Sequence, residues 1–522
     1  MDGVKERTGP KVASYENSSV YEGFPYFRYV VEEPKMGDKE KLIVDSLKDL
    51  INGNASVEEV KRKLPWFSND FLKAFREKII AQITYKNALS VIIEPGEFEA
   101  LKLNLIAIFK EFMPQLKDPS FLANIIMDAT VGYGMIAPLV RDPNLEEIMI
   151  NGYDKPLFVF HKRYGMCKTN IDTRKERKVD NLINRIAATV GKSINQSNPL
   201  LDARLLEGDR ANATFQTVTP MGPTLTIRKF TSIPLSVVDM VANNTLTSEL
   251  AAFMWVMVEG LNIEPMNILI TGGTGSGKTT LLNALASFIK YQDRVITIED
   301  TLELHLGSRE NWIQMESKPK TRESDEVSMD DLLKNAMRMR PDRIIVGEVR
   351  GKEAQTLLVA MDTGHQGSMG TLHSNSGKEM ILRLKAEPMS VPESMISLLH
   401  LIVVMYRIYL RDRGIIRRVV RVSEITSMEG KPLIGEIYEW NKERDFLERT
   451  DIPSHTMEVL AEKTMKSKKE IMKEIIVRKK IIEWMLKNNI RSNPEVETII
   501  QGYYTSPKEL LNEVLGLDAE NA

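Results

Sequence analysis

A glycine-rich segment, GGTGSGKTT at residues 272–280, has the residue types and spacing of a phosphate-binding loop. Gly272 is followed by four residues and then by Gly277, Lys278 and Thr279, which fits the pattern G-x-x-x-x-G-K-[ST]. Glycines let the backbone wrap closely, so that its N–H groups point at phosphate oxygens. An apolar run precedes the loop and a helical pattern follows it. The segment therefore predicts a site for a nucleoside triphosphate.

Side chains of the loop have distinct predicted roles. Lys278 is expected to reach the β and γ phosphates, and the Thr279 hydroxyl is expected to hold Mg²⁺. The other predicted nucleotide contacts of the loop are Gly273, Thr274, Gly275, Ser276, Gly277 and Thr280.

Two acidic strands supply candidate carboxylates for hydrolysis, which needs one to position or deprotonate water and others to organise Mg²⁺. The run ITIEDTLELHL ends a strand in Glu299 and Asp300, with Glu303 beyond. The run RPDRIIVGEVRG carries Glu348 after a glycine, where an ordinary Walker B strand ends in aspartate. Residues past such strands lie beside the phosphate loop. For the first run a helix N-terminus capped by Asp300 remains an open alternative.

The segment TGHQGSMGTLHSNS carries His365 and His373. An imidazole can hydrogen-bond to phosphate and respond to its loss, which favours a γ-phosphate sensor. A zinc site is disfavoured because no cysteine and little carboxylate lies nearby in the sequence. A polar loop with a structural histidine is the remaining interpretation.

Composition excludes several classes of protein. The chain has 522 residues, enough for about three domains, and a formal net charge of −2, which argues against bulk electrostatic binding of nucleic acid. Its one cysteine, Cys167, excludes a disulfide framework and a multi-cysteine zinc site. The polar N-terminus does not resemble a secretory signal. The most apolar run, MISLLHLIVVMY, is too short to span a membrane and predicts a buried strand after a helix.

Changes of pattern along the chain predict its organisation. The runs VITIED, RIIVGEV and LIVVMY are apolar strands that alternate with helices, as in a doubly wound α/β domain. The expected regions are a flexible arm (1–36), a helical N-terminal region (37–117), an α+β domain (118–230), a hinge linker (231–236), an α/β ATPase domain (237–455) and a helical C-terminal extension (456–522).

The order of these motifs resembles the secretion-motor ATPase superfamily of type II and type IV secretion, type IV pili and archaella. The loop, TIEDTLEL, RIIVGEVRG and GHQGSMGTLHS resemble its Walker A, Asp box, atypical Walker B and His box. The segments APLVRDPNLEEIMING and LLDARLLEGDRANA…LTIRKF resemble its N-terminal domain. The resemblance covers about 118–430. It implies an α/β protein with a RecA-like P-loop ATPase domain, a preceding α+β domain and helical N- and C-terminal extensions.

The resemblance also implies residue roles. Glu303 takes the position of the general base, and Glu299 and Glu348 support the attacking water and Mg²⁺. His373 and His365 sense the nucleotide. The resemblance also places Arg204, Arg210 and Arg228 near the phosphates in the closed state. Some of these arginines act across a subunit boundary.

The implied machine is an ATP- and Mg²⁺-dependent homohexamer at the cytoplasmic, inner face of the cell membrane. Motion about the linker pushes a polytopic membrane platform protein and adds pilin subunits to a filament. The lack of a four-cysteine zinc module favours the archaeal and Tad-like pilus-assembly branch over bacterial extension ATPases. Archaellum motors usually read GETASGKTT where this chain reads GGTGSGKTT, which favours pilus assembly over archaellum rotation.

Three alternatives stay open: an archaellum motor, a conjugation-type DNA-pumping ATPase and a non-hydrolysing ATP-sensing scaffold. We expect neither a nucleic-acid partner nor a small-molecule substrate beyond ATP, because the near-neutral chain offers no basic, aromatic-laced track and no apparent acceptor pocket. The presence of Lys278, Thr279, Glu303 and Glu348 argues against the scaffold.

Overall fold

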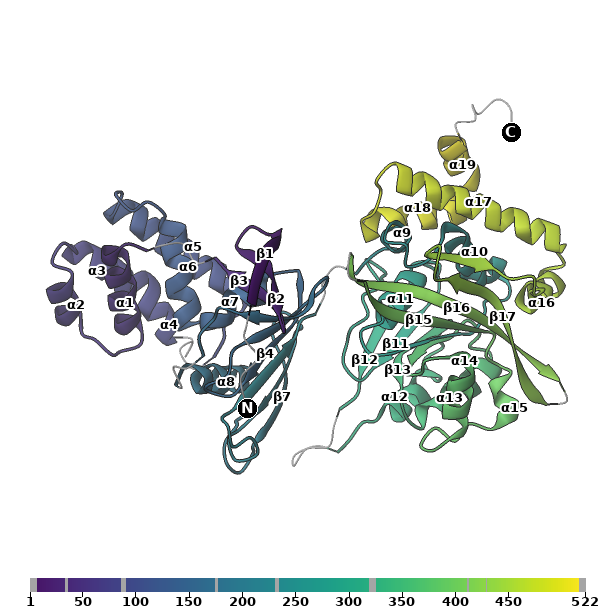
Figure 1. Cartoon of the computed structure of the whole chain (residues 1–522), viewed down its shortest axis with the longest axis horizontal. Coiled ribbons are helices and arrows are strands. Elements are labelled where there is room, and N and C mark those ends of the chain that lie inside the picture. The colour runs from purple at the N-terminus through teal and green to yellow at the C-terminus, as the bar shows by residue number, and fades with distance from the viewer. Residues whose placement is uncertain are drawn as a thin grey trace. The chain divides into compact units, whose positions relative to one another are not determined.

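The chain folds into two compact units, Met1–Thr231 and Ser232–Ala522 (Figure 1). The computed structural model describes residues 7–32, 36–85, 91–173, 177–230, 234–318, 325–410, 413–428 and 430–515. Of the predicted hinge linker, residues 231–233 lie outside these ranges. After it, helix α9 begins at Val237, where Ser236 caps the helix by accepting a hydrogen bond from the Asp239 N–H.

The first unit begins with a helical region that has its own core. Its elements are α1 (Asp38–Ile51), α2 (Val57–Lys63), α3 (Asn69–Phe75), the π-helical turn η1 (Arg76–Ile80), α4 (Ala81–Tyr85), α5 (Pro95–Phe112) and α6 (Pro119–Thr130). Phe71, Phe75 and Phe109 are buried at its centre. The sequence SNDF predicts an N-cap ahead of a helix, and Ser68 does accept a hydrogen bond from the Phe71 N–H, 3.0 Å away.

A nine-stranded sheet forms the rest of the first unit, in the order β1-β2-β3-β6-β5-β4-β9-β8-β7. The strands are β1 (Arg7–Ser14), β2 (Ser18–Phe24), β3 (Phe27–Val31), β4 (Leu145–Asn151), β5 (Phe158–His161), β6 (Gly165–Thr169), β7 (Leu200–Arg204), β8 (Arg210–Thr214) and β9 (Thr224–Arg228). The helical elements beside it are η2 (Gly134–Ile136), α7 (Ala137–Arg141) and α8 (Arg177–Thr189).

The first three strands correct one prediction. Residues 1–36 were expected to form a flexible arm, yet residues 7–31 form β1, β2 and β3, and β3 pairs with β6. The reason is burial, because Val20 and Tyr29 enter the core of the sheet and the Tyr29 hydroxyl donates to Asp142. Residues 1–6 and 33–35 lie outside the described ranges.

The second unit is built on a sheet in the order β12-β11-β13-β14-β10-β15-β16-β17-β18, in which the first six strands are parallel. Its strands are β10 (Ile268–Gly272), β11 (Val295–Glu299), β12 (Trp312–Glu316), β13 (Arg343–Val349), β14 (Met369–Leu372), β15 (Leu401–Leu410), β16 (Gly414–Met428), β17 (Lys431–Asn441) and β18 (Phe446–Arg449). The predicted strands VITIED, RIIVGEV and LIVVMY correspond to β11, β13 and β15, which confirms them.

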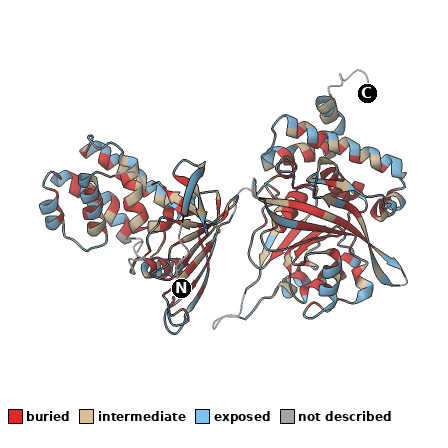
Figure 2. Ribbon diagram, in the orientation of Figure 1, coloured by how far each residue is buried: buried red, intermediate tan, exposed pale blue. Residues whose placement is uncertain are grey.

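Helices cover both faces of this sheet, so its central strands are buried (Figure 2). In β10, Ile268 and Ile270 belong to one core and Leu269 to the other, as strand alternation requires. The helical elements up to β15 are α9 (Val237–Ala242), α10 (Ser248–Glu259), η3 (Gly260–Asn262), α11 (Lys278–Ala286), α12 (Met329–Ala336), α13 (Glu353–Asp362), α14 (Gly377–Lys385) and α15 (Glu393–Ile396).

The C-terminal helices share a core with the α/β sheet. They are α16 (His455–Thr464), α17 (Lys468–Lys487), α18 (Asn493–Thr505) and α19 (Pro507–Leu515). Residues of α17 and α18 lie in the same apolar cluster as those of α10 and α11. The Arg478 guanidinium of α17 donates to the Glu259 carboxylate of α10 at 2.9 Å, and both side chains are almost completely buried. This ion pair joins the C-terminal helices to the domain that carries the phosphate loop.

Replacing Arg478 by alanine is expected to lower the free energy of unfolding by about 3 kcal/mol, because the buried Glu259 carboxylate then loses its main counter-charge. Chemical denaturation of the purified protein measures this loss. The matched control, Lys480→Ala on an exposed position of the same helix, is expected to change stability by less than about 0.5 kcal/mol. Equal effects of the two variants would show that the ion pair does not join the helices to the sheet.

Candidate functional site

The phosphate-binding pattern adopts the predicted strand–loop–helix geometry. Strand β10 ends at Gly272 and α11 begins at Lys278. Gly277 has φ 93°, a left-handed conformation that glycine adopts without strain. The N–H groups of the first turn of α11 have no partner within the helix, and the buried Ser276 hydroxyl has none in the described structure. These donors form a cradle that fits a phosphate group.

Strand order brings the motifs to one edge of the sheet. Because β14 lies between β10 and β13, His373 just past β14 lies between the phosphate loop and Glu348 on β13. The Lys278 Nζ is 3.4 Å from His373 Nε2, which is 3.9 Å from Glu348 Oε1. Arg350 donates to Glu348 Oε2 at 2.7 Å and lies 3.5 Å from an Asp300 carboxylate oxygen. We call Lys278, His373, Glu348, Arg350 and Asp300 the carboxyl-edge row.

The charges in this row shift two pKa values. Burial, and secondarily the neighbouring Lys278 ammonium, lowers the pKa of His373, so its imidazole is neutral at pH 7. Burial alone would raise the pKa of Glu348, but the Arg350 hydrogen bond and the nearby cations outweigh it and lower that pKa. Glu348 is therefore ionised and a neutral imidazole separates it from Lys278.

Glu299 lies beneath the row in a space that a glycine provides. A Cβ atom on Gly347 would be 2.8 Å from Glu299 Cγ, so no larger residue fits there while Glu299 keeps its position. Burial raises the pKa of Glu299 to about 7. Its Oε2 accepts hydrogen bonds from the N–H groups of Glu303 and Leu304 at 2.7 and 3.0 Å, and its buried Oε1 has no partner. Glu299 thus fixes the backbone at Glu303.

No helix begins at Asp300, so the alternative in which it caps a helix is excluded. Its carboxylate instead accepts a hydrogen bond from the Ser317 hydroxyl at 3.0 Å and pairs with Arg350. Glu303 follows in a segment without regular secondary structure and is half-buried.

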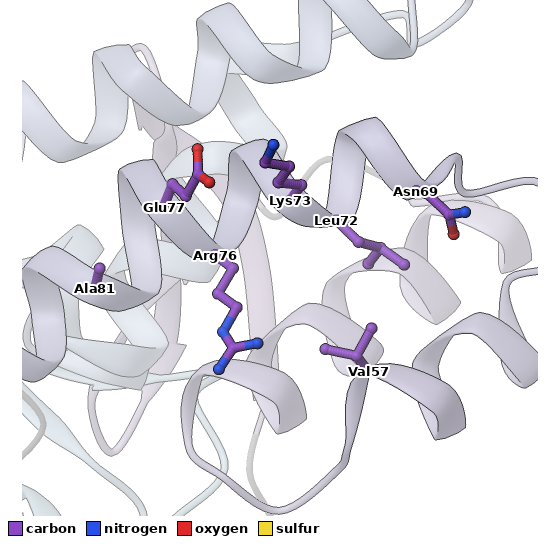
Figure 3. A pocket seen from close by; sticks show the side chains of 7 residues that line it. All are labelled: Val57, Asn69, Leu72, Lys73, Arg76, Glu77 and Ala81. Carbon is purple, nitrogen blue, oxygen red and sulfur yellow. The ribbon is translucent and has the colours of Figure 1, made fainter.

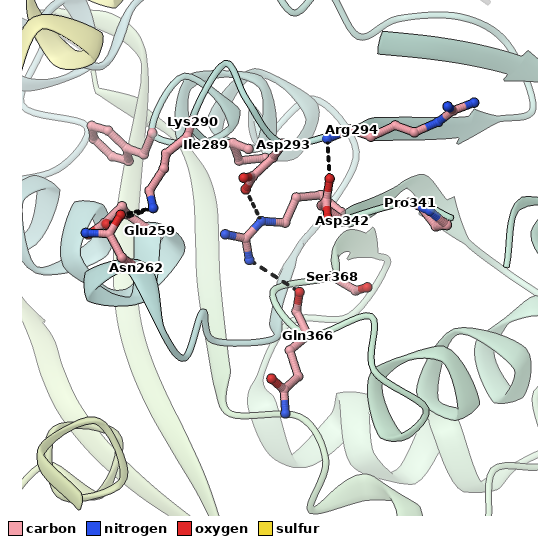
Figure 4. Close-up of polar contacts among 12 residues, drawn as sticks. Glu259, Asn262, Ile289, Lys290, Asp293, Arg294, Pro341, Asp342, Gln366 and Ser368 are labelled. Atoms are coloured by element: carbon pink, nitrogen blue, oxygen red, sulfur yellow. Dashed lines mark hydrogen bonds and ion pairs between the residues drawn. The ribbon is translucent and has the colours of Figure 1, made fainter. Parts of the chain in front are cut away.

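His365, the other predicted nucleotide sensor, does not join the row. It precedes β14, whereas His373 follows that strand, so the two lie at opposite edges of the sheet. Its Nδ1 contacts the Pro341 carbonyl at 3.2 Å. The neighbouring loops are held by Arg343, which pairs with Asp293 at 2.9 Å and donates to the Gln366 carbonyl (Figure 4). The GHQG half of the segment therefore serves loop packing at the amino edge.

The three predicted arginines lie together in the first unit. Arg204, Arg210 and Arg228 occupy directly opposed positions on β7, β8 and β9, and all three are exposed. Arg210 pairs with Asp202 at 2.8 Å. Because opposed residues share one face of a sheet, the three side chains form what we call the arginine strip.

One surface pocket lies away from the row. It has a volume of about 490 Å³ and lies in the helical region of the first unit, and residues of α2, α3, η1 and α4 line it, including Val57, Leu72 and Arg76 (Figure 3). None of the predicted site residues lines it.

The residues at the loop fit ATP and Mg²⁺. The α11 cradle and Lys278 suit phosphate oxygens, while Thr279 and the ionised Glu348 offer the hard oxygen ligands that Mg²⁺ prefers. Within the described ranges no three His, Cys, Asp or Glu side chains gather as a metal site, so any bound Mg²⁺ would also need phosphate or water oxygens.

Comparison with known proteins identifies the family. The family model described as "Type II/IV secretion system protein" matches residues 130–480. This chain belongs to that family. The resemblance drawn from the motifs is thereby confirmed, as is the α/β fold class with helical extensions. Among the helices of the described ranges, none is both long and apolar enough to cross a bilayer.

Relatives of this family member come from archaea and bacteria. An uncharacterized protein of Methanocaldococcus jannaschii is 52% identical over 45% of this chain, a match that spans 33% of that relative's length. A second uncharacterized protein of that organism is 34% identical over 72% of this chain and 68% of its own. Conjugal transfer protein TrbB of Rhizobium radiobacter is 34% identical over 52% of this chain and 80% of its own.

Two features of the row escaped the sequence analysis. The sequence analysis assigns no role to Arg350, which follows β13 directly and lies two residues after Glu348. The role of Gly347 depends on Glu299 of the neighbouring strand. No local pattern shows that approach.

The raised pKa of Glu299 predicts a pH-dependent stability difference. The folded-state pKa of about 7 lies above the ordinary 4.5, so the wild type loses stability as pH rises through this window. Glu299→Gln has no such proton to lose. In denaturation experiments without nucleotide or Mg²⁺, the free energy of unfolding of the variant relative to that of the wild type should rise by roughly 2–3 kcal/mol from pH 5 to pH 8. A difference independent of pH would contradict the raised pKa.

Gly347→Ala should displace Glu299 and cost about 1–3 kcal/mol through overpacking. Because the clash is with the Glu299 side chain, adding Glu299→Ala should recover part of that loss, which a double-mutant cycle measures. Additive effects of the two substitutions would show that Gly347 is not required for the approach of Glu299.

Proposed function

We propose that this chain is an ATPase that hydrolyses ATP at the carboxyl-edge row and drives a secretion or pilus-type machine. The observation that carries the proposal is the continuity of the row: the imidazole of His373 lies 3.4 Å from the phosphate-loop lysine Lys278 and 3.9 Å from the Walker B glutamate Glu348. Their arrangement supports a phosphate sensor that contacts both the binding loop and the carboxylate.

In this mechanism the α11 cradle and Lys278 bind the β and γ phosphates. Thr279 and Glu348 would hold Mg²⁺, which would supply positive charge beside the phosphate oxygens. Glu303 acts as general base, orienting water and taking its proton. Glu299 positions Glu303 by accepting a 2.7 Å hydrogen bond from the Glu303 N–H. Burial and a second donor, the Leu304 N–H, hold the Glu299 carboxyl group in place.

His373 and Arg350 supply the response to the phosphate. A bound γ-phosphate would attract the Lys278 ammonium, whose Nζ now lies 3.4 Å from His373 Nε2, and so would weaken that contact. Loss of phosphate would restore the row as seen here. The arginine strip of the first unit supplies further positive charge for phosphates, within one subunit or across a boundary, when the linker closes.

The finer proposal is a homohexamer at the inner face of the cell membrane that works on a polytopic platform protein. Pilus assembly of the archaeal and Tad-like branch is the favoured machine, because Cys167 is the only cysteine and is buried. An archaellum motor remains the neighbouring alternative.

A conjugation-type role is the second candidate, favoured by the similarity to TrbB, which is named a conjugal transfer protein. The two candidates differ in what raises the ATPase rate. A DNA-pumping enzyme should respond to added DNA, whereas the pilus motor should respond only to its membrane platform.

Glu303→Gln should retain ATP binding but lower kcat by roughly 10²–10⁴-fold, because it removes the proton acceptor while keeping the size of the side chain. Steady-state ATPase assays and nucleotide titrations measure the two effects, and mass photometry with ATP tests for the hexamer. The matched control is Glu310→Gln at an exposed position, expected to match the wild type. A wild type that binds ATP without turnover in any assembly state would refute hydrolysis and favour the scaffold.

A further inference from the structure

Strands β15 and β16 continue past the sheet edge as a hairpin beside the phosphate loop. Strand β15 pairs with β10 only as far as Met405, while its pairing with β16 continues from Tyr406 to Leu410. We call residues 406–410 and 414–418 the arginine hairpin. It belongs to none of the four sequence motifs, and the proposed mechanism does not use it.

The hairpin places two arginines against the loop. Arg407 and Arg417 are direct cross-strand partners. The Arg417 Nε donates to the Gly275 carbonyl at 2.9 Å. A Cβ atom on Gly275 would be 2.9 Å from an Arg407 guanidinium nitrogen, and one on Gly277 would be 3.3 Å from Arg417 Cδ. The loop glycines thus leave room for the two arginine side chains on one side of the loop. They also allow the backbone curvature that phosphate binding needs.

The base of the hairpin is anchored, so the contact is held in place. Arg418, the next residue on β16, points away from Arg417 and is buried. It donates to both carboxylate oxygens of Asp445 at 2.7 and 2.8 Å. On β15, the Tyr406 hydroxyl donates to the Asn375 carbonyl, two residues after His373. The hairpin is therefore tied to both the phosphate loop and the histidine segment.

We propose that Arg417 and Arg407 are positioning residues for a nucleoside polyphosphate at the loop. Arg417 holds the loop in its binding conformation through the Gly275 carbonyl. Arg407 adds positive charge at the same place, which favours the anionic phosphates of a bound nucleotide. The proposal rests on the proposed function, because it assumes that the loop binds nucleotide.

The test is the dissociation constant for ADP and for ATP, each with Mg²⁺, measured by calorimetry on the full chain, together with KM and kcat. Arg417→Ala should raise both dissociation constants and KM roughly tenfold, the loss expected for a charge-assisted hydrogen bond. The kcat at saturating ATP should stay within about threefold of the wild type. Arg417→Lys, which keeps a charged donor, should recover part of the affinity.

Matched variants separate positioning from a general folding defect. Arg421→Ala lies on the same strand, where Arg421 pairs instead with Glu436 and Glu439, and it should bind like the wild type. Arg407→Ala changes an exposed side chain and should weaken ADP binding severalfold even if Arg417→Ala folds poorly.

The outcomes distinguish the two proposals. If the wild type binds and hydrolyses ATP while Arg417→Ala and Arg407→Ala keep its dissociation constants, the positioning role is overturned and the proposed function stands. If the wild type binds neither ADP nor ATP, both fail. A loss of kcat with unchanged KM and affinity would also contradict the positioning role.

Discussion

The position of one strand brings the residues of the candidate site together. Strand β14 lies between the phosphate-loop strand β10 and the acidic strand β13, and all three are parallel. Parallel strands end at the same edge, so the residue just past β14 must face both neighbours. His373 occupies that place, between Lys278 and Glu348. Motifs separated by about a hundred residues of sequence thereby become one continuous set of polar contacts.

The second constraint is the burial of Glu299 against Gly347. A carboxylate in the core of a sheet is costly unless donors satisfy it, and the N–H groups of Glu303 and Leu304 do so for one oxygen. The chain after β11 is therefore held in a path without regular secondary structure and does not enter a helix. This path presents Glu303 at the carboxyl edge. Gly347, which stands in place of the usual Walker B aspartate, leaves the space that the Glu299 side chain occupies.

Local patterns predicted what is local. The phosphate loop, the buried strands and the Ser68 cap follow from residue types at short spacing, and their predictions are confirmed. Features that depend on distant residues were missed. The sequence of the N-terminal strands is polar and predicts an arm, because the core that buries Val20 and Tyr29 is formed by distant residues. His365 and His373 are close in sequence, but β14 lies between them and places them at opposite ends of the strand.

The C-terminal helices show the same limit. Their lysine-rich sequence suggests a solvated extension, yet Arg478 is buried on Glu259, more than two hundred residues earlier in the chain. Charge alone does not reveal burial when the partner lies on another helix. The α/β domain and the C-terminal helices thus form one folded unit, so changes in the helices are expected to reach the phosphate loop through α10 and α11.

The most direct test of the central claim is an experimental structure of the full chain with Mg²⁺ and a non-hydrolysable ATP analogue. The account predicts the β phosphate in the α11 cradle, Lys278 moved from His373 to the phosphates, and Glu303 facing the γ-phosphate with a water between them. A nucleotide bound elsewhere, or one bound at the loop with Glu303 turned away and the Lys278–His373 contact unchanged, would contradict it.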